Sequence, residues 1–268
     1  MKTKSVSNLE YIFAVGRIRA LENFLIKSEV FEEAIESDLG EALRLFVEAD
    51  LYSEELLHVK DSRQLEDLLA QELSKVKKLV SELILDKELL RLLDLNTTEC
   101  AVHIVRNYPS KLLKDYLLHV IDMHNIKSFL RLYVLKEPRE KLETEISCEG
   151  FIRKKDFLEL YDKELTAFLN RLEYVHKDCC TLDYTYSLGQ AIDKAVRENS
   201  FIALEKSMND FLINVLKAAK YLGFGPEPVL AYYFAKANEI GLIRMIILAK
   251  LNNVSAELLK ERLNSVYA

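Results

Sequence analysis

The sequence contains few of the residues that interrupt helices. It has 7 glycines and 4 prolines among 268 residues, whereas average usage would give about 19 and about 13. Both residues break helices, and tight β-turns depend on glycine, so a sheet-rich fold would need more of them. Tryptophan is absent, which leaves tyrosine and phenylalanine as the large aromatic groups. The scarcity predicts an all-α chain built from long helices.

Cysteine is also sparse and shows no framework. The four cysteines are Cys100, Cys148, Cys179 and Cys180, and a chain of this size does not need disulfides to fold, so we expect reduced thiols. His176 with Cys179 and Cys180 is the one combination that suggests zinc. Adjacent cysteines cannot easily chelate one ion, and zinc usually takes four ligands from spaced pairs. We therefore favour thiols in a loop and predict no metal site.

Long hydrophobic runs are absent, although half of the residues are hydrophobic. Apolar runs such as FLINVL (211–216), which Asn214 interrupts, and MIILA (245–249) are far below the ~20 residues that a membrane-spanning helix needs. The first residues, MKTKSVSNLEY, lack the apolar region of a secretory signal. A net charge of -6 speaks against a nucleic-acid partner, which would require a basic face. We expect a folded chain without a direct transmembrane span.

Motifs for cofactor and substrate chemistry are also missing. The only clustered glycines, Gly223 and Gly225, follow a helical stretch, whereas a phosphate-binding loop follows a strand. The nucleophile motif G-x-S-x-G and the zinc motif H-E-x-x-H do not occur. The sequence therefore predicts no cofactor and gives no support for an enzyme.

Helix signals, by contrast, occur along most of the chain. Capping-box patterns, in which two side chains satisfy free amides of a first turn, stand at SNLE (7–10), DLGE (38–41), NTTE (96–99) and SLGQ (187–190). Apolar residues at three- and four-residue steps predict long helices at 62–84, 110–135, 200–222 and 228–251. We expect about ten or more helices and no strand. The segment KDCCTLDYTY (177–186) is interpreted as a loop or linker.

One helix carries several ionisable residues on one face. Asp115, His119 and Asp122 follow one another at four- and three-residue steps, with His124 close by. A carboxylate–histidine pair could move protons or hold a metal, which would suit an all-α enzyme. We favour the alternative, a polar helix surface with ordinary side-chain pairs.

An internal echo links two of the predicted helices. Ile126 and Lys136 recur as Ile240 and Lys250, 114 residues later, and a shorter helix follows each. Helical periodicity alone produces such echoes, so the repeat is a hypothesis at this point.

Three segments resemble the family of C subunits of V-type and A-type rotary ATPases, which are called d subunits in eukaryotes. The segment DMHNIKSFLR (122–131) is similar to the middle signature of the family, with Asp122, Asn125 and Arg131 in place, and a Gly-x-Ile step follows at 150–152. The C-terminal stretch 227–263 matches more closely, at Pro228, Ala231, Tyr232, Glu239, Ile240, Arg244 and Lys250. The stretch YIFAVGRIRALENFL (11–25) resembles the opening helix, with Arg17, Arg19 and Ala20 in place.

The matches stand in the family's order, but two departures accompany them. The chain is shorter than typical members, so we expect a helix or loop to be trimmed, with 177–186 as the candidate. Leu132 also stands where a small residue is more usual.

The resemblance implies a fold and a role. The family fold is a funnel of three similar helical bundles with pseudo-threefold symmetry. One mouth accepts the central-shaft subunits, and the other side rests on the cytoplasmic face of the membrane proteolipid ring. The implied protein is a non-catalytic connector, peripheral to the membrane through its complex, that couples ATP to ion transport. We expect one unit, 1–268, with approximate sub-bundles 1–108, 109–222 and 223–268, the last packing with the N-terminal helices.

The resemblance also singles out eight residues of structural or socket-lining type: Arg17, Arg19, Asp122, Asn125, Arg131, Glu239, Arg244 and Lys250. Arg131, Glu239 and Arg244 stand among apolar helix positions, where a charge needs a partner. We favour internal pairing over a position in the socket. The alternative function is a free-standing helical adaptor that binds a partner helix or peptide in a groove.

Overall fold

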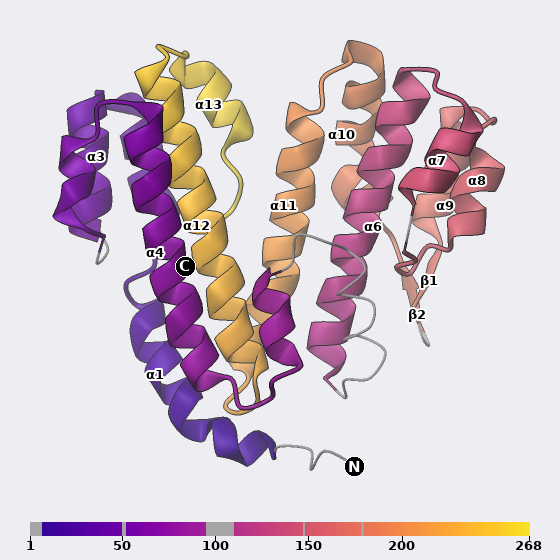
Figure 1. Cartoon of the computed structure of the whole chain (residues 1–268). Helices are drawn as coiled ribbons and strands as arrows, with labels where there is room; N and C mark the ends of the chain where they lie inside the picture. Colours follow the sequence, from indigo (N-terminus) through magenta and orange to yellow (C-terminus); the bar gives the residue numbers. More distant parts are fainter. Residues whose placement is uncertain (1–6, 50–51, 95–109, 147, 178–179) are drawn as a thin grey trace. The chain divides into compact units, whose positions relative to one another are not determined.

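The computed structural model describes residues 7–49, 52–94, 110–146, 148–177 and 180–268, and it confirms the all-α class (Figure 1). The α-helices are α1 (Ile12–Glu22), α2 (Ser28–Glu36), α3 (Leu39–Ala49), α4 (Ser62–Leu83), α6 (Lys111–Val134), α7 (Arg139–Glu145), α8 (Lys154–Leu160), α9 (Leu165–Glu173), α10 (Thr185–Glu198), α11 (Ile202–Leu216), α12 (Glu227–Leu251) and α13 (Ala256–Arg262). Short 3₁₀ helices are η1 (Asn8–Tyr11), η2 (Glu54–His58), η3 (Leu89–Asp94) and η4 (Lys217–Tyr221). The capping pattern at 96–99 lies outside the described residues.

The long helices begin where local capping chemistry places them. Asp61 accepts the amide of Gln64 at 2.9 Å to begin α4, and Ser110 accepts that of Leu113 at 3.2 Å to begin α6. Pro228 stands in the first turn of α12, where its missing N–H costs nothing. The helix predicted at 200–222 is instead divided into α11 and η4.

One small hairpin corrects the expectation of no strand. Strand β1 (Val175–Lys177) pairs antiparallel with β2 (Cys180–Leu182), and Val175 lies opposite Leu182. Of the segment expected to be a loop, Lys177 and Cys180–Leu182 thus belong to strands, and α10 begins at Thr185. Val175 of β1 is β-branched, which suits a strand, and just beyond β2 the Tyr184 amide donates to the Leu172 carbonyl oxygen at 2.9 Å.

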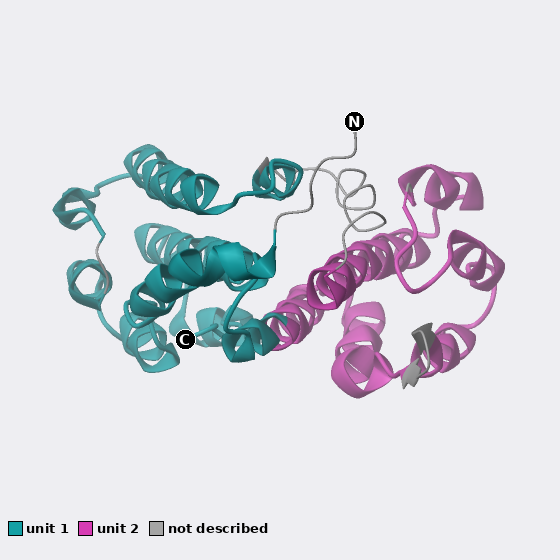
Figure 2. Cartoon of the chain, turned by 90° about the horizontal axis from the view of Figure 1, so that it is seen from below, with its two compact units in different colours: residues 1–93, 216–268 teal, residues 94–215 magenta. Residues whose placement is uncertain are grey.

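The chain forms two compact units (Figure 2). Unit 1 comprises residues 1–93 and 216–268, and unit 2 comprises residues 94–215. In unit 1, α12 lies beside α4 and also packs on α1, α2 and α3 (Figure 1). The C-terminal helices of unit 1 thus complete a core that the N-terminal helices begin, with Phe31, Phe46, Leu65, Leu69 and Ile243 fully buried. The division into three bundles stays a prediction.

The core of unit 2 lies between α6 and the shorter helices that follow it. Aromatic rings fill much of it: Phe129 stacks on Phe168 with centroids 4.0 Å apart and meets Tyr161 edge-on at 5.5 Å. Leu142 of α7 and Leu172 of α9 are also fully buried there. Such packed rings leave few alternative arrangements for the surrounding helices.

The same structural motif occurs once in each unit. The number of residues between its two copies differs from that of the echo seen in the sequence. Helix α6 ends before Lys136, which has a positive φ of 53°, and the seven-residue α7 follows; α12 ends before Asn253, with φ 55°, and the seven-residue α13 follows. The amide of Glu137 donates to Leu132 at 3.0 Å, and that of Val254 donates to Ala249 at 2.8 Å, which is the same helix-terminating bond. The repeat register is therefore 117 residues (136 to 253), not 114.

Candidate functional site

Helices α6 and α12 each bury a carboxylate at the same place in the repeat. Asp122 lies on α6 and Glu239 on α12, 117 residues apart, with 0% and 3% of their surfaces exposed. A buried carboxylate is costly unless hydrogen bonds or a counter-charge satisfy it. We call the groups around Glu239 the unit 1 node and those around Asp122 the unit 2 node.

In the unit 1 node, Glu239 receives two hydrogen bonds and an ion pair. The Ile26 amide donates to Oε2 at 2.7 Å, and the Tyr52 hydroxyl donates to Oε1 at 2.8 Å. The Lys236 ammonium, one turn earlier, pairs with the same Oε1 and lies 4.2 Å from the centre of the Tyr52 ring. Burial lowers the pKa of Lys236, and Glu239 partly offsets this. The node is a charge-balanced pair with hydrogen bonds on both carboxylate oxygens.

In the unit 2 node, Asp122 receives three hydrogen bonds. The amides of Phe151 and Ile152 donate at 3.0 and 3.1 Å, and the Tyr184 hydroxyl donates at 2.8 Å. The same hydroxyl lies 2.8 Å from Nδ1 of His119, one turn earlier on α6. Burial raises the pKa of Asp122 to about 7, although the hydrogen bonds from Tyr184, Ile152 and Phe151 act in the opposite direction.

The partners of the two carboxylates also correspond. Ile26 stands two residues before α2, and Ile152 stands two residues before α8; the residues between are the N-caps Lys27 and Arg153. In each unit the carboxylate thus ties a long helix to the loop that enters the next short helix. The hydroxyl group comes from Tyr52, which follows α3 in the sequence of unit 1, and from Tyr184, which follows α9 and the hairpin in unit 2.

Gly150 allows the loop of the unit 2 node to approach α6. A Cβ at this position would overlap the Asp122 carboxylate and lie 2.7 Å from the carbonyl oxygen of Leu118. The backbone of α6 cannot move away, so only glycine fits without rearrangement. This explains the Gly-x-Ile step at 150–152.

The interpretation of Asp115, His119 and Asp122 as a polar surface is wrong. All three are buried on α6, at 9%, 2% and 0% exposure, because α10, α11 and the 148–153 loop cover that face. Within the described ranges, no group of three or more histidine, cysteine or acidic side chains is arranged to hold a metal ion. Cys179 lies outside those ranges, so the prediction for the His176 cluster stays untested.

Three other residues of the family motif, Arg19, Asn125 and Lys250, hold the framework together. Arg19 pairs with Glu22 and donates to the carbonyl oxygens of Ala219 and Leu222 at 2.7 and 2.9 Å, which fastens α1 to η4. Asn125 donates to the Cys148 carbonyl oxygen at 2.9 Å. Lys250 donates to the carbonyls of Ile35 and Ser37, at the C-terminal end of α2. Glu239 has the internal partners that its sequence context favoured.

The arginines lie closer to the surface. Arg244 of α12 pairs with Glu66 of α4 at 2.9 Å, and both side chains are more than 40% exposed. Arg17 and Arg131 are exposed, and neither forms an ion pair with another described residue. The internal partner expected for Arg131 is therefore not found.

Sequence patterns did not reveal a cluster of exposed apolar side chains at one end of unit 1. It consists of Leu9, Ile12, Phe13, Leu85, Tyr221 and Phe224, with exposures of 64%, 57%, 77%, 46%, 90% and 51%. We call it the apolar end. Two ties bring its segments together: the Tyr11 hydroxyl accepts the amides of Leu85 and Asp86, and the Gly225 amide donates to the Asn8 carbonyl oxygen. Helix α1 has apolar residues on more than one side. Packing covers the side with Val15 and Ile18, so Ile12 and Phe13 on the uncovered side remain in water.

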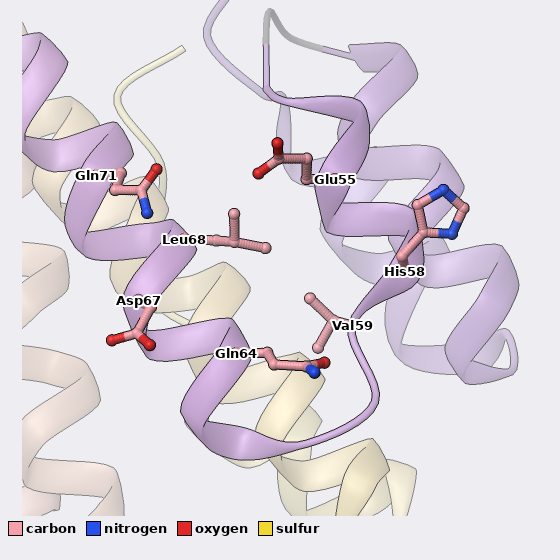
Figure 3. A pocket seen from close by; sticks show the side chains of 7 residues that line it. All are labelled: Glu55, His58, Val59, Gln64, Asp67, Leu68 and Gln71. Atoms are coloured by element: carbon pink, nitrogen blue, oxygen red, sulfur yellow. The ribbon is translucent and has the colours of Figure 1, made fainter.

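An open groove of about 320 Å³ lies between η2 and the first half of α4 (Figure 3). Its lining residues are Glu55, His58, Val59, Gln64, Asp67, Leu68 and Gln71. It lacks the predominantly apolar walls and few convergent polar groups typical of small-molecule sites. We assign it no role.

The family profile described as ATP synthase (C/AC39) subunit matches residues 87–262, about two thirds of the chain. The chain belongs to this family. It is also 28% identical over 231 residues to the C subunit of the V-type sodium ATPase of Enterococcus hirae. That alignment covers 83% of this chain and 66% of the relative, just under two thirds of its length. No solved structure matches the chain significantly.

Family membership confirms the family that the resemblance indicated; the segment 122–131 and nearly all of 227–263 lie within the match, whereas 11–25 precedes it. The matched region contains α6, α12 and both nodes' carboxylates, but it excludes residues 1–86, which hold α1 to α4 and four of the six side chains of the apolar end. Among the helices formed by the described residues, none is long and apolar enough to cross a bilayer.

Proposed function

We propose that this chain is the non-catalytic connector of the central stalk in a V-type rotary ATPase, linking the rotating shaft to the membrane proteolipid ring. Membership of the C/AC39 family supports the assembly. The relative in Enterococcus hirae is named as part of such an ATPase. The connector role itself, the position on the cytoplasmic face and the absence of catalysis belong to the proposal.

The internal construction of each unit suits a part that transmits torque. Long helices are fastened to neighbouring loops by buried carboxylates rather than by apolar contact alone, as Glu239 and Asp122 show. A hydrogen bond depends on direction, so these ties resist sliding of one helix along another. Few glycines are present to act as hinges.

The observation that carries the proposal beyond family membership is the apolar end of unit 1. Six large exposed apolar side chains in one place are unusual on a soluble surface and mark an interaction site. Exposed aromatic residues near cations, such as Phe13 one turn from Arg17 on α1, suit the level where a membrane protein meets the lipid headgroups. We therefore propose that the apolar end contacts the proteolipid ring rather than the central shaft.

Deleting the protein tests the connector role. The ATPase head should still hydrolyse ATP while ATP-driven ion transport across the membrane is lost, because the shaft would turn without gripping the ring. Both rates are measured on the same membrane preparation. Intact ion transport in the deletion strain would contradict the proposal and leave the free-standing adaptor as the better hypothesis.

Variants of the apolar end test the docking surface separately. Phe13→Ser with Phe224→Ser should release the protein from membranes that contain the ring, while its unfolding temperature stays close to that of the native chain. Leu135→Ser, at a residue 63% exposed in unit 2, is the matched control. Cross-linking from position 13 should reach a protein of the ring; cross-links to the shaft alone would show that the assignment of this end is wrong.

A further inference from the structure

The two nodes differ in the group that accompanies the carboxylate. In unit 1 it is Lys236, an ammonium ion paired with Glu239. The equivalent position in unit 2, 117 residues earlier, is His119, which reaches Asp122 only through the hydroxyl of Tyr184. Among the residues that the structure describes, no lysine or arginine forms an ion pair with Asp122. The carboxylate in unit 2 is therefore buried without a fixed counter-charge in contact.

His119, Tyr184 and Asp122 form a hydrogen-bonded chain that admits two directions. With Asp122 ionised, the Tyr184 hydroxyl donates to the carboxylate and His119 Nδ1–H donates to the Tyr184 oxygen. With Asp122 protonated, the acid O–H donates to the Tyr184 oxygen, and the Tyr184 hydroxyl donates to a bare Nδ1 of His119, whose proton then stands on Nε2. Tyrosine serves both directions because a hydroxyl donates and accepts.

Charged groups from the neighbouring helices surround the hydrogen-bonded chain of His119, Tyr184 and Asp122. From α9, Arg171 acts on Asp122 at a distance, but it pairs with Asp156 of α8 at 2.9 Å, which Arg153 also contacts. Asp115 lies one turn before His119 on α6, and Asp210 comes from α11.

We propose that His119, Tyr184 and Asp122 are a buried proton-binding site, which takes up one proton in the neutral range and thereby tightens the packing of unit 2. Binding needs no other ligand, and it reverses the two hydrogen bonds of the chain. The unit 1 node, whose charge Lys236 balances, does not share this behaviour.

The sign of the effect follows from the direction of the shift. Burial raises the pKa of Asp122 to about 7, whereas an aspartate in an unfolded chain titrates near about 3.9. The folded chain therefore holds a proton that the unfolded chain has lost between about pH 4 and about pH 7. Its contribution to stability is fully present below about pH 4, and it is lost as the pH rises to about 7.

The site has a short way to solvent. Phe211 packs edge-on against His119, with centroids 4.9 Å apart, and against Tyr184 at 5.5 Å. The same side chain lines an open pocket of about 440 Å³ with Ser187, Ser207, Asp210, Asn214 and Val215. A single aromatic ring thus borders both the chain and the pocket, so small motions of Phe211 suffice for proton exchange.

Urea unfolding across pH 4 to 9 tests the proposal in the full-length protein. Relative to Asp122→Asn, which cannot ionise, the native unfolding constant should rise about tenfold per pH unit up to about pH 7 and then level off. Asp156→Asn is the matched control. Burial raises the pKa of Asp156, but hydrogen bonds from Arg153 and Arg171 outweigh this and lower it, so its ratio to native should be flat above about pH 5. A flat ratio for Asp122→Asn as well would overturn the proposal.

Nuclear magnetic resonance of the native chain tests it without relying on a variant at position 122. The Asp122 carboxyl carbon and the His119 ring nitrogens should change together, with one midpoint near neutral pH. Tyr184→Phe should raise the Asp122 midpoint, because the lost hydrogen bond lowers the pKa of Asp122, whereas Tyr52→Phe in unit 1 should leave it unchanged. A midpoint near pH 4 for Asp122, or separate midpoints for the two residues, would show that no such site exists.

Discussion

Unit 1 and unit 2 solve the same packing problem with different electrostatics. Both bury a carboxylate on a long helix, and both satisfy it with an isoleucine amide and a tyrosine hydroxyl. In unit 1 a lysine one turn earlier balances the charge. In unit 2 the equivalent residue is a histidine, which contacts the carboxylate only through the tyrosine hydroxyl. The hydrogen-bond geometry is thus shared, and the response to pH is set by one neighbouring side chain.

The same comparison extends along the two helices. Arg244 of α12 pairs with Glu66 across to α4, and its repeat equivalent, Lys127 of α6, pairs with Glu205 of α11. Lys250, which donates to the end of α2, corresponds to Tyr133, which packs on Tyr161 at the end of α8. Each repeat position keeps its structural task while the chemistry that performs it changes.

The largest expected effect comes from breaking the charge balance of unit 1. Glu239→Gln removes the carboxylate charge beside a buried ammonium, which should cost about 3–5 kcal/mol of unfolding free energy. Urea denaturation at neutral pH measures it. Adding Lys236→Met should recover part of the loss, because the buried charge is then gone. A cost below about 1 kcal/mol for Glu239→Gln would show that the pair contributes little to unit 1.

Gly150 provides the next test, in unit 2. Gly150→Ala places a methyl group against Asp122 and the Leu118 carbonyl oxygen, and the strain should cost about 1–3 kcal/mol. Gly241→Ala on α12 is the control, because a Cβ there has no neighbour within 4 Å. That variant should stabilise the chain by about 0.5–1 kcal/mol through helix propensity. Thermal unfolding of both variants decides whether the close approach is specific to the unit 2 node.

Lys250, the repeat equivalent of Tyr133, tests how much the hydrogen bonds at this position contribute to the free energy of unfolding. Lys250→Met retains the apolar stem but removes the donors to the carbonyls of Ile35 and Ser37. The loss of these hydrogen bonds at a helix C-terminus should cost about 1 kcal/mol. Faster amide exchange in α3, which α2 precedes directly, should accompany it. Unchanged stability would mean that solvent replaces the lysine.

The smallest effects are expected for the exposed ion pairs. Arg244→Ala and Lys127→Ala should each cost about 0–1 kcal/mol, and less at high salt, because all four side chains of these pairs are partly exposed to solvent. Arg244→Glu should do more than Arg244→Ala, since it places two carboxylates together on α12 and α4, and it should weaken assembly. Assembly that survives Arg244→Glu unchanged would exclude this surface as one that the complex requires.

Local chemistry made much of the fold predictable. Asp61 and Ser110 each accept an amide three residues ahead, and Pro228, which has no amide hydrogen to satisfy, stands in the first turn of α12, so these helices begin where the sequence indicates. The family signatures likewise depend on spacing along the chain. For the same reason the 117-residue repeat could not be found from side chains alone: what recurs is a helix end with a positive φ, at Lys136 and Asn253, whose residue types differ.

The sequence by itself indicated most of the helices and the family, because those properties depend on residues close together in the chain. The capping pattern at 187–190 was wrong, because these residues lie inside α10, which begins at Thr185. Tertiary structure decided which faces are covered. It buried Asp115, His119 and Asp122, which the sequence presents as a polar stripe, and it left Phe13 and Phe224 exposed although they are apolar. Periodicity shows that a helix has faces, but only the elements packed against it decide which face meets water.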